Sequence, residues 1–428
     1  MRETAGAPPD DAFADRVVDS VASRRNYATT FMAESLVVIS ALLAYRLVAR
    51  AYGPEGFAEY AIARRALTLV LPFGVLGLDV AIARFVALAL ARGARSAATY
   101  VLAGLSVAAV AAGVTSAALI VFREPLTELI FGPGPSSQLT AALPVLVIGA
   151  ALHVVSYSSM RGFGRIGRAN LLMVANHAFL PVAVVLALRE SLPQLLAALG
   201  VGWILISLLS LLTVPMSSLA IRSRSVELLG YGLRRVPGDF VQLLFFALPA
   251  ILVAHVGTLQ EAGIVALAIS ALGMVGSGLT PISFVLLPLA AGLFGRSSPN
   301  ELRAHVAALA RVVVPLLLIG VVLVELLAEP ALVAYLGPDF APGADVLRIV
   351  MLGAIPWGVY VLLKSILDAR YVAAINARNL AIAFGVFAVA GLPTVVLSAG
   401  TTGVLFAFVL GLYALGILTV IEARRSLR

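Results

Sequence analysis

Long apolar runs alternate with short polar connections along the whole chain. The runs are apolar on every face, without the two-residue alternation that is typical of membrane β-strands. A helix that crosses the roughly 30 Å hydrocarbon core of a bilayer needs about 20 mostly apolar residues. The pattern therefore predicts twelve transmembrane helices, at residues 27–50, 60–89, 98–122, 138–160, 170–188, 194–219, 237–256, 262–294, 305–328, 343–367, 379–398 and 402–421.

The amino-acid composition also indicates a protein that is surrounded by a lipid bilayer. Hydrophobic residues make up 61% of the chain and charged residues 12%, and the mean hydropathy is +1.04. A soluble domain has about 25% charged residues and about half apolar ones. The sequence therefore predicts an all-α polytopic membrane protein.

Basic residues cluster in alternate connections between the predicted helices. By the positive-inside rule these connections are cytoplasmic, which predicts a multi-pass protein of the cell membrane with both termini in the cytoplasm. Anionic lipid then accounts for the net charge of +8, so no nucleic acid is expected as a partner. The arginines concerned are Arg24, Arg25, Arg92, Arg95, Arg161, Arg165, Arg168, Arg222, Arg224, Arg234, Arg235, Arg296, Arg303, Arg370, Arg378, Arg424, Arg425 and Arg428.

The two halves of the chain contain the same sequence features in the same order. Gly132-Pro133 and Gly337-Pro338 lie 205 residues apart, and each is followed by an apolar run, a basic turn, an asparagine and another apolar run. Six helices in each half predict parallel repeats, related by an axis roughly along the membrane normal. The expected organisation is a tail at 1–26, six-helix bundles at 27–219 and 237–421 around a central cavity, a linker at 220–236 and a tail at 422–428.

The polar parts of the sequence contain little catalytic chemistry. No targeting signal appears in the first 26 residues, which fit a short interfacial helix or a disordered tail equally well. The absence of cysteine excludes disulfides and thiol catalysis. The histidines show no metal-ligand spacing and are expected to be packing or interfacial residues, so no metal and no cofactor are predicted; they are His153, His177, His255 and His305.

Arginines also occur inside the predicted helices. Arg46 lies in the first helix, and Arg64 and Arg65 lie about one turn into the second. A charge at such a depth costs at least about 2.5–3.5 kcal/mol and usually faces a cavity or a partner. Lining of a cavity and structural pairing are both open. In a cavity, paired guanidinium donors suit phosphate oxygens, which indicates an anionic substrate bound by these three residues. Glu34 and Glu325 are the acids that could bind a coupling cation.

Two segments resemble the start of polysaccharide-biosynthesis flippases. They are residues 52–61, YGPEGFAEYA, and residues 77–86, GLDVAIARFV, and the turns Phe131-Gly132-Pro133 and Leu336-Gly337-Pro338 are similar to that family's as well. These flippases are the Wzx-like members of the multidrug/oligosaccharidyl-lipid/polysaccharide exporter superfamily. The resemblance covers residues 26–425. It implies two six-helix bundles around a central cavity, often cationic, that move lipid-linked saccharides between leaflets by alternating access.

Three functions compete at this point. The first is a flippase for a polyprenyl-(pyro)phosphate-linked saccharide, which explains the buried arginines and the short loops. The second is a cation-coupled multidrug exporter of the same superfamily, which would need acids deep in its cavity, and few acids occur there. The third is a polytopic glycosyltransferase or ligase, which would need larger loops that carry acids. The sequence therefore favours a transporter and not an enzyme.

Overall fold

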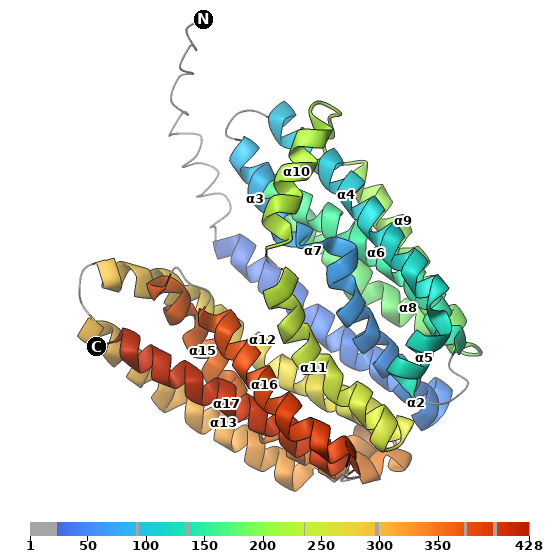
Figure 1. Cartoon of the computed structure of the whole chain (residues 1–428), viewed down its shortest axis with the longest axis vertical. Helices are drawn as coiled ribbons and strands as arrows, with labels where there is room; N and C mark the ends of the chain where they lie inside the picture. Colours follow the sequence, from blue (N-terminus) through green and yellow to red (C-terminus); the bar gives the residue numbers. More distant parts are fainter. Residues whose placement is uncertain are drawn as a thin grey trace, which may run out of the picture. The chain divides into compact units, whose positions relative to one another are not determined.

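The computed structural model describes residues 24–90, 94–132, 137–234, 236–295, 299–371, 375–396 and 400–427. Within these ranges the chain forms helices joined by short turns, and no strand (Figure 1). The predicted tail at 1–26 lies outside the described residues except for its last three positions, which begin the first helix. The helices are α2 (Arg24–Val75), α3 (Leu78–Leu90), α4 (Ala94–Val121), α5 (Arg123–Phe131), α6 (Ser137–Gly162), α7 (Ile166–Val174), η1 (Ala175–Phe179), α8 (Leu180–Ala187), α9 (Leu192–Leu211), α10 (Ile221–Gly232), α11 (Val236–Val256), α12 (Leu259–Gly295), α13 (Pro299–Leu336), η2 (Pro338–Gly343), α14 (Ala344–Met351), α15 (Ala354–Arg370), α16 (Ile375–Val396) and α17 (Gly400–Ser426).

The lengths of the helices confirm an all-α polytopic membrane protein. In the described part of the chain nine helices are long and apolar enough to cross a membrane, and Pro338–Met351 with Ala354–Arg370, bent by 43°, make a tenth when the pair is counted as one span. The shorter helix Ile375–Gly391 lies at the predicted eleventh span. Ala28–Val75 has 48 residues, or about 72 Å, more than twice the hydrocarbon thickness. When this helix is counted as two crossings, the total is consistent with the twelve predicted spans.

A kink at Gly53 divides α2 into two parts. Gly53 has φ 68° and ψ −171°, a backbone conformation that residues with a Cβ atom rarely adopt. Pro54 follows and has no N–H to donate into the helix. The sequence predicted a connection between two spans here, and the structure contains a bent helix instead. Residues 24–52 are called the N-terminal part of α2 and residues 54–75 the C-terminal part.

The second predicted span, at 60–89, is broken rather than continuous. Leu76 (φ 51°) and Gly77 (φ 70°) have left-handed backbones and separate α2 from α3. The C-terminal end of α10 packs into this break, because a Cβ on Gly77 would lie 2.6 Å from the carbonyl oxygen of Gly232. Only glycine allows so close an approach of the two backbones. The prediction of one uninterrupted helix was therefore wrong at this point.

Aromatic and charged side chains hold α10 against α3 and α4. Arg224 Nη1 lies 2.9 Å from Glu227 Oε1 and donates to the hydroxyl of Tyr100 at 2.8 Å. Burial acts to lower the pKa of Arg224, but Glu227 and Tyr100 outweigh it and raise that pKa above its ordinary value. Nearby, the Arg84 guanidinium lies 4.9 Å from the ring centre of Tyr231. These contacts fix a polar helix on two apolar ones.

The helices form two compact units. The first comprises Met1–Ala51, Leu67–Thr127 and Pro135–Asp239, and the second comprises Tyr52–Ala66, Glu128–Gly134 and Phe240–Arg428. The boundary thus crosses α2 twice, after Ala51, close to its kink at Gly53, and again after Ala66. The predicted division into bundles at 27–219 and 237–421 stays a prediction.

Helix α6 is the centre of the first unit and packs mainly on α9, α4 and α3. Small residues bring α6 and α9 together, since a Cβ on Gly149 would lie 2.7 Å from the carbonyl oxygen of Gly200. Close backbone contact through small residues is the usual way in which membrane helices associate.

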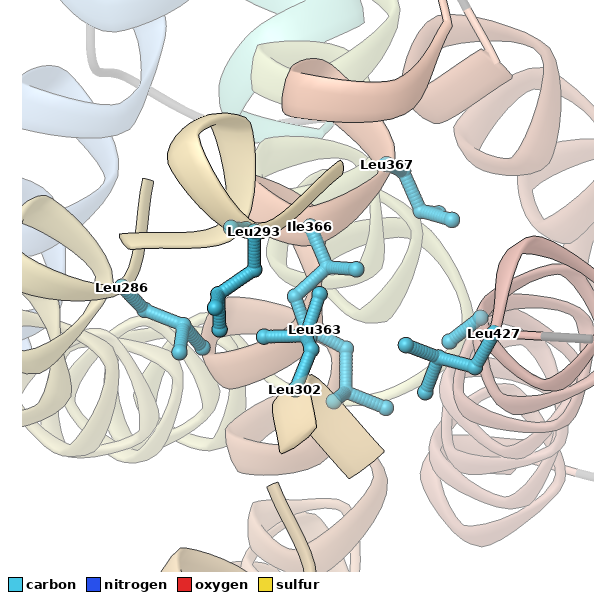
Figure 2. Packing of buried hydrophobic residues seen from close by; sticks show 9 residues of the cluster. Leu286, Leu293, Leu302, Leu363, Ile366, Leu367 and Leu427 are labelled. Carbon is cyan, nitrogen blue, oxygen red and sulfur yellow. The ribbon is translucent and has the colours of Figure 1, made fainter. Parts of the chain in front are cut away.

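The second unit has an aromatic core and a separate aliphatic cluster. Phe245 packs against Phe387 and Phe408, and Phe246 lies 4.6 Å from Trp357 between ring centres. The aliphatic cluster joins the C-terminal ends of α12, α15 and α17 with the start of α13 (Figure 2). Its members are Leu286, Ala290, Leu293, Leu302, Leu363, Ile366, Leu367, Ala423 and Leu427.

Positions that the duplication makes equivalent touch each other in the second unit. A Cβ on Gly263 would lie 2.4 Å from the Cα of Ala58, and Arg65 bonds to Ser270 across the same separation of 205 residues. Two such pairs one after another require the C-terminal part of α2 and α12 to run in the same direction. An antiparallel arrangement would bring only one equivalent pair together. The contacts therefore support parallel repeats.

Candidate functional site

Arg65 lies half-buried on the C-terminal part of α2 and binds α12. Its Nη2 donates to the carbonyl oxygen of Ala266 at 2.8 Å and to the hydroxyl oxygen of Ser270 at 2.7 Å. Ser270 in turn donates to the carbonyl oxygen of Ala266 at 2.8 Å. The sequence left two roles open for this arginine, lining of a cavity and structural pairing. In the structure Arg65 makes a structural pairing. A contact of Arg65 with substrate stays a prediction.

Arg64 and Arg46 have different surroundings. Arg64 is exposed, and its guanidinium lies 5.9 Å from the ring centre of Tyr60, one turn earlier on α2. Arg46 is half-buried on the N-terminal part of α2, in the first unit, and Arg50 on the next turn is exposed. The structure brings Arg64 and Arg65 together on one turn, whereas Arg46 is described only within the other unit.

The acids predicted for a coupling cation lie in different units. Glu34 is exposed on α2, and Glu325 is half-buried on α13, where its backbone carbonyl accepts a hydrogen bond from Arg348. Among the residues that the structure describes, no group of three or more histidine, cysteine or acidic side chains could hold a metal ion.

An open apolar groove lies between the N-terminal part of α2 and α7. Its volume is about 640 Å³. Phe31, Met32 and Leu171 line it and are 59%, 69% and 68% exposed. The lining includes the buried Asn170, which donates to the hydroxyl of Thr30 at 3.1 Å, and the exposed Arg168 lies two residues earlier on α7. Sequence analysis did not find this groove, because the apolar side chains of a lipid-facing helix look the same whether or not they line one.

A buried polar cluster joins α6, η1 and α9 in the first unit. His153 on α6 and Ser207 on α9 both contact the side chain of Asn176, which lies in the π-helical turn η1. The ring centre of His153 lies 4.4 Å from that of His177, and His177 lies 5.4 Å from Trp203. The sequence predicted packing roles for both histidines and did not predict that they meet.

The π-helical turn has a local cause in the sequence. Pro181 has no N–H, so it cannot donate to the carbonyl of Asn176 or of His177. The N–H of Leu180 bonds to Ala175, five residues earlier, and leaves the carbonyl of Asn176 without a backbone donor. Trp203 Nε1 donates to this carbonyl at 2.7 Å instead. Turns of this kind occur frequently at functional sites. The signal in the sequence from which the π-helical turn could have been predicted was a proline five residues after Asn176.

Similar folds occur among solved structures of membrane transporters. An inward-facing multidrug resistance MATE family transporter of the MOP superfamily has a TM-score of 0.74 and 16% identity, over 91% of this chain and 94% of that one. The lipid II flippase MurJ, in an inward closed conformation, has a TM-score of 0.73 and 14% identity, over 92% and 87%. A MOP superfamily transporter from Pyrococcus furiosus, whose reversed pocket polarity suggests a different function, has a TM-score of 0.62 and 14% identity, over 100% and 99%.

No protein-family model matches the sequence, and no curated protein matches it. The structural likeness extends over nearly the whole chain at identities that show the fold alone. The chain therefore has the fold of the MOP superfamily of membrane transporters, which confirms, at the level of fold, the superfamily that its sequence resembles.

Proposed function

We propose that this protein is a flippase that moves a lipid-linked oligosaccharide or polysaccharide precursor across the cell membrane by alternating access. The observation that carries the proposal is the placement of Arg46, Arg64 and Arg65 in the apolar helix α2. Guanidinium groups at membrane depth are costly unless they serve a partner, and they suit phosphate oxygens. A polyprenyl-(pyro)phosphate-linked saccharide supplies such oxygens together with a lipid chain.

The apolar groove beside α7 supports a lipid-linked substrate. Its lining of Phe31, Met32 and Leu171 suits a hydrocarbon chain, while Asn170 in the lining and Arg168, two residues earlier on α7, suit a headgroup. The lipid II flippase among the structural neighbours has the same fold. The proposal includes orientation: both termini lie in the cytoplasm, and six-helix bundles at 27–219 and 237–421 move about a central cavity. The protein acts on no covalent bond and is not an enzyme.

A multidrug exporter is the second candidate function. The MATE family transporter among the structural neighbours has this fold as well, so the fold does not separate the two functions. A cation-coupled exporter needs acids that bind the cation, and Glu34 and Glu325 are the acids available for it. Glu34 is exposed, and 291 residues separate it from the half-buried Glu325 in the sequence. This favours the flippase, because an isolated carboxylate is a weak cation site.

Reconstitution in liposomes tests the proposal. The purified protein is expected to move a labelled polyprenyl-pyrophosphate oligosaccharide between leaflets. Arg46→Ala and Arg64→Ala each reduce that rate by about tenfold, the effect of losing one charged hydrogen bond of roughly 1.5 kcal/mol. Arg50→Ala, on the same helix and exposed, is the matched control and keeps the wild-type rate.

Two results would contradict the flippase. One is the absence of lipid transport together with cation-driven efflux of a dye, which indicates the exporter. The other is a wild-type rate in a variant that carries both Arg46→Ala and Arg64→Ala, which removes these side chains from the substrate site.

A further inference from the structure

The polar cluster of the first unit lies near the middle of the membrane-spanning helices. Asn176 is ten residues from the start of the candidate span Ile166–Ala187, or about 15 Å along a helix. Asn176 and Ser207 are 0% exposed and His153 is 8% exposed. Ionisable and polar side chains at this depth are expensive and usually have a function. Neither the arginines proposed to bind phosphate nor the groove uses this cluster.

The hydrogen bonds of Asn176 define the protonation state of His153. The amide nitrogen Nδ2 donates to Ser207 Oγ at 3.1 Å and lies 2.9 Å from His153 Nδ1. An amide nitrogen can only donate, so His153 accepts at Nδ1 and is neutral, with its proton on Nε2. Asn176 Oδ1 is buried and has no hydrogen-bond partner among the described residues. An unpaired buried acceptor is rare and costs about 1–3 kcal/mol.

Uptake of a proton reverses this arrangement without a change of backbone. A hydronium ion that gives its proton to Nδ1 of His153 loses one O–H bond and becomes water, and the new N–H turns Nδ1 into a donor, which repels the amide nitrogen. Rotation of the amide by half a turn exchanges Oδ1 with Nδ2. Oδ1 then accepts from His153 Nδ1 and from the hydroxyl of Ser207. The oxygen gains two partners and Nδ2 takes the position without one, so the arrangement is held by the charged imidazole and reverses when the proton leaves.

His177 connects this buried group with the surface of the unit. His177 is half-buried, and its ring meets that of His153 edge to face. Two imidazoles so close titrate as a coupled pair, in which the first charge disfavours the second. On α6 itself Tyr157 stacks on His153, and Arg161 lies 5.6 Å from the Tyr157 ring centre. From α9 the cluster receives Trp203 and Ser207, neither of which titrates near neutral pH, and no described carboxylate acts on His153.

We propose that His153, His177 and Asn176 form a proton-binding site that takes up one proton. The side-chain amide of Asn176 rotates in response. The site goes beyond the proposed function, because it needs no knowledge of the transported substrate. Its signal reaches α9 directly, since Trp203 holds the backbone carbonyl of Asn176. A proton at mid-membrane can thus change how η1 packs on α9.

Tryptophan fluorescence tests the site without any transported substrate. The chain has two tryptophans, and Trp357→Phe leaves Trp203 as the single probe. The indole nitrogen of Trp357 is buried without a hydrogen-bond partner among the described residues, so this change removes no such bond. Trp203 bonds to the backbone carbonyl of Asn176, so a rearrangement at Asn176 changes the surroundings of the indole. The full-length variant in nanodiscs, titrated from about pH 8 to about pH 4, is expected to change its fluorescence in a one-proton transition.

Histidine variants in this background assign the transition. His153→Asn abolishes the transition, because the imidazole that takes up the proton is lost, and His177→Gln moves its midpoint, because the coupled partner is lost. His255→Gln and His305→Gln are matched controls and leave the curve unchanged. A flat titration with all four histidines present, or an unchanged curve in His153→Asn, overturns the proposal. If the buried His153→Asn variant does not fold, an unchanged midpoint in the half-buried His177→Gln overturns it instead, because the two imidazoles are then not coupled. Loss of lipid transport with an intact titration would instead contradict the flippase.

Discussion

Arg65 joins two helices through one guanidinium nitrogen. The contact explains how a charged side chain persists in an apolar helix: the backbone carbonyl of Ala266 and the hydroxyl of Ser270 replace water as its partners. The neighbouring Arg64 is exposed. Adjacent residues of one type therefore have different energetic roles, which the sequence alone could not separate.

This difference predicts a difference in stability. Arg65→Ala is expected to lower the free energy of unfolding by about 1 kcal/mol, the usual size of an interhelical polar contact in a membrane protein. Arg64→Ala leaves stability unchanged within a few tenths of a kcal/mol. Thermal unfolding followed by intrinsic fluorescence in one detergent compares the two variants. Equal melting temperatures would mean that the bond to α12 contributes nothing.

At the level of elements, α10 has an unusual place, because its C-terminal end fills the break between α2 and α3. The approach of Gly232 to the backbone of Leu76 and Gly77 makes this docking sensitive to a single methyl group. A Cβ on Gly232 would lie 2.1 Å from the carbonyl oxygen of Leu76. Gly230, two residues earlier on the same helix, has nothing within 4 Å of such an atom.

The two glycines provide a matched test of that docking. Gly232→Ala is expected to destabilise the first unit by more than about 1 kcal/mol, because the backbones must move apart. Gly230→Ala is neutral or stabilising by about 0.5–1 kcal/mol, the gain of alanine over glycine in a helix. Limited proteolysis near α10, together with melting temperatures, measures the difference. Similar behaviour of both variants would contradict the close contact.

At the level of the whole molecule, the orientation in the membrane is the feature most open to a direct test. The positive-inside pattern predicts that α10 faces the cytoplasm and that the turn before α9 faces outward. The chain has no cysteine of its own, so a single introduced thiol reports its side of the membrane without background.

Labelling of single cysteines tests this orientation. Ser191→Cys, in the turn before α9, is expected to react with a membrane-impermeant maleimide in intact cells. Ser223→Cys, on the exposed face of α10, reacts only after permeabilisation. The reverse pattern would invert the molecule, and reaction of both positions in intact cells would contradict the count of spans between them.

Several features followed from the sequence because they depend on local physics. A bilayer requires apolar runs of a minimum length, so hydropathy was sufficient to locate the membrane-spanning segments. The distribution of arginines was sufficient to predict the direction in which each segment crosses the membrane. The offset of 205 residues was also visible, and the contacts of Ala58 with Gly263 and of Arg65 with Ser270 follow it. The break at Leu76–Gly77, the partner of Arg65, the groove beside α7 and the meeting of His153 with His177 were not predictable. Each depends on a backbone or side chain from a distant part of the chain, and only packing determines which of many apolar faces come together.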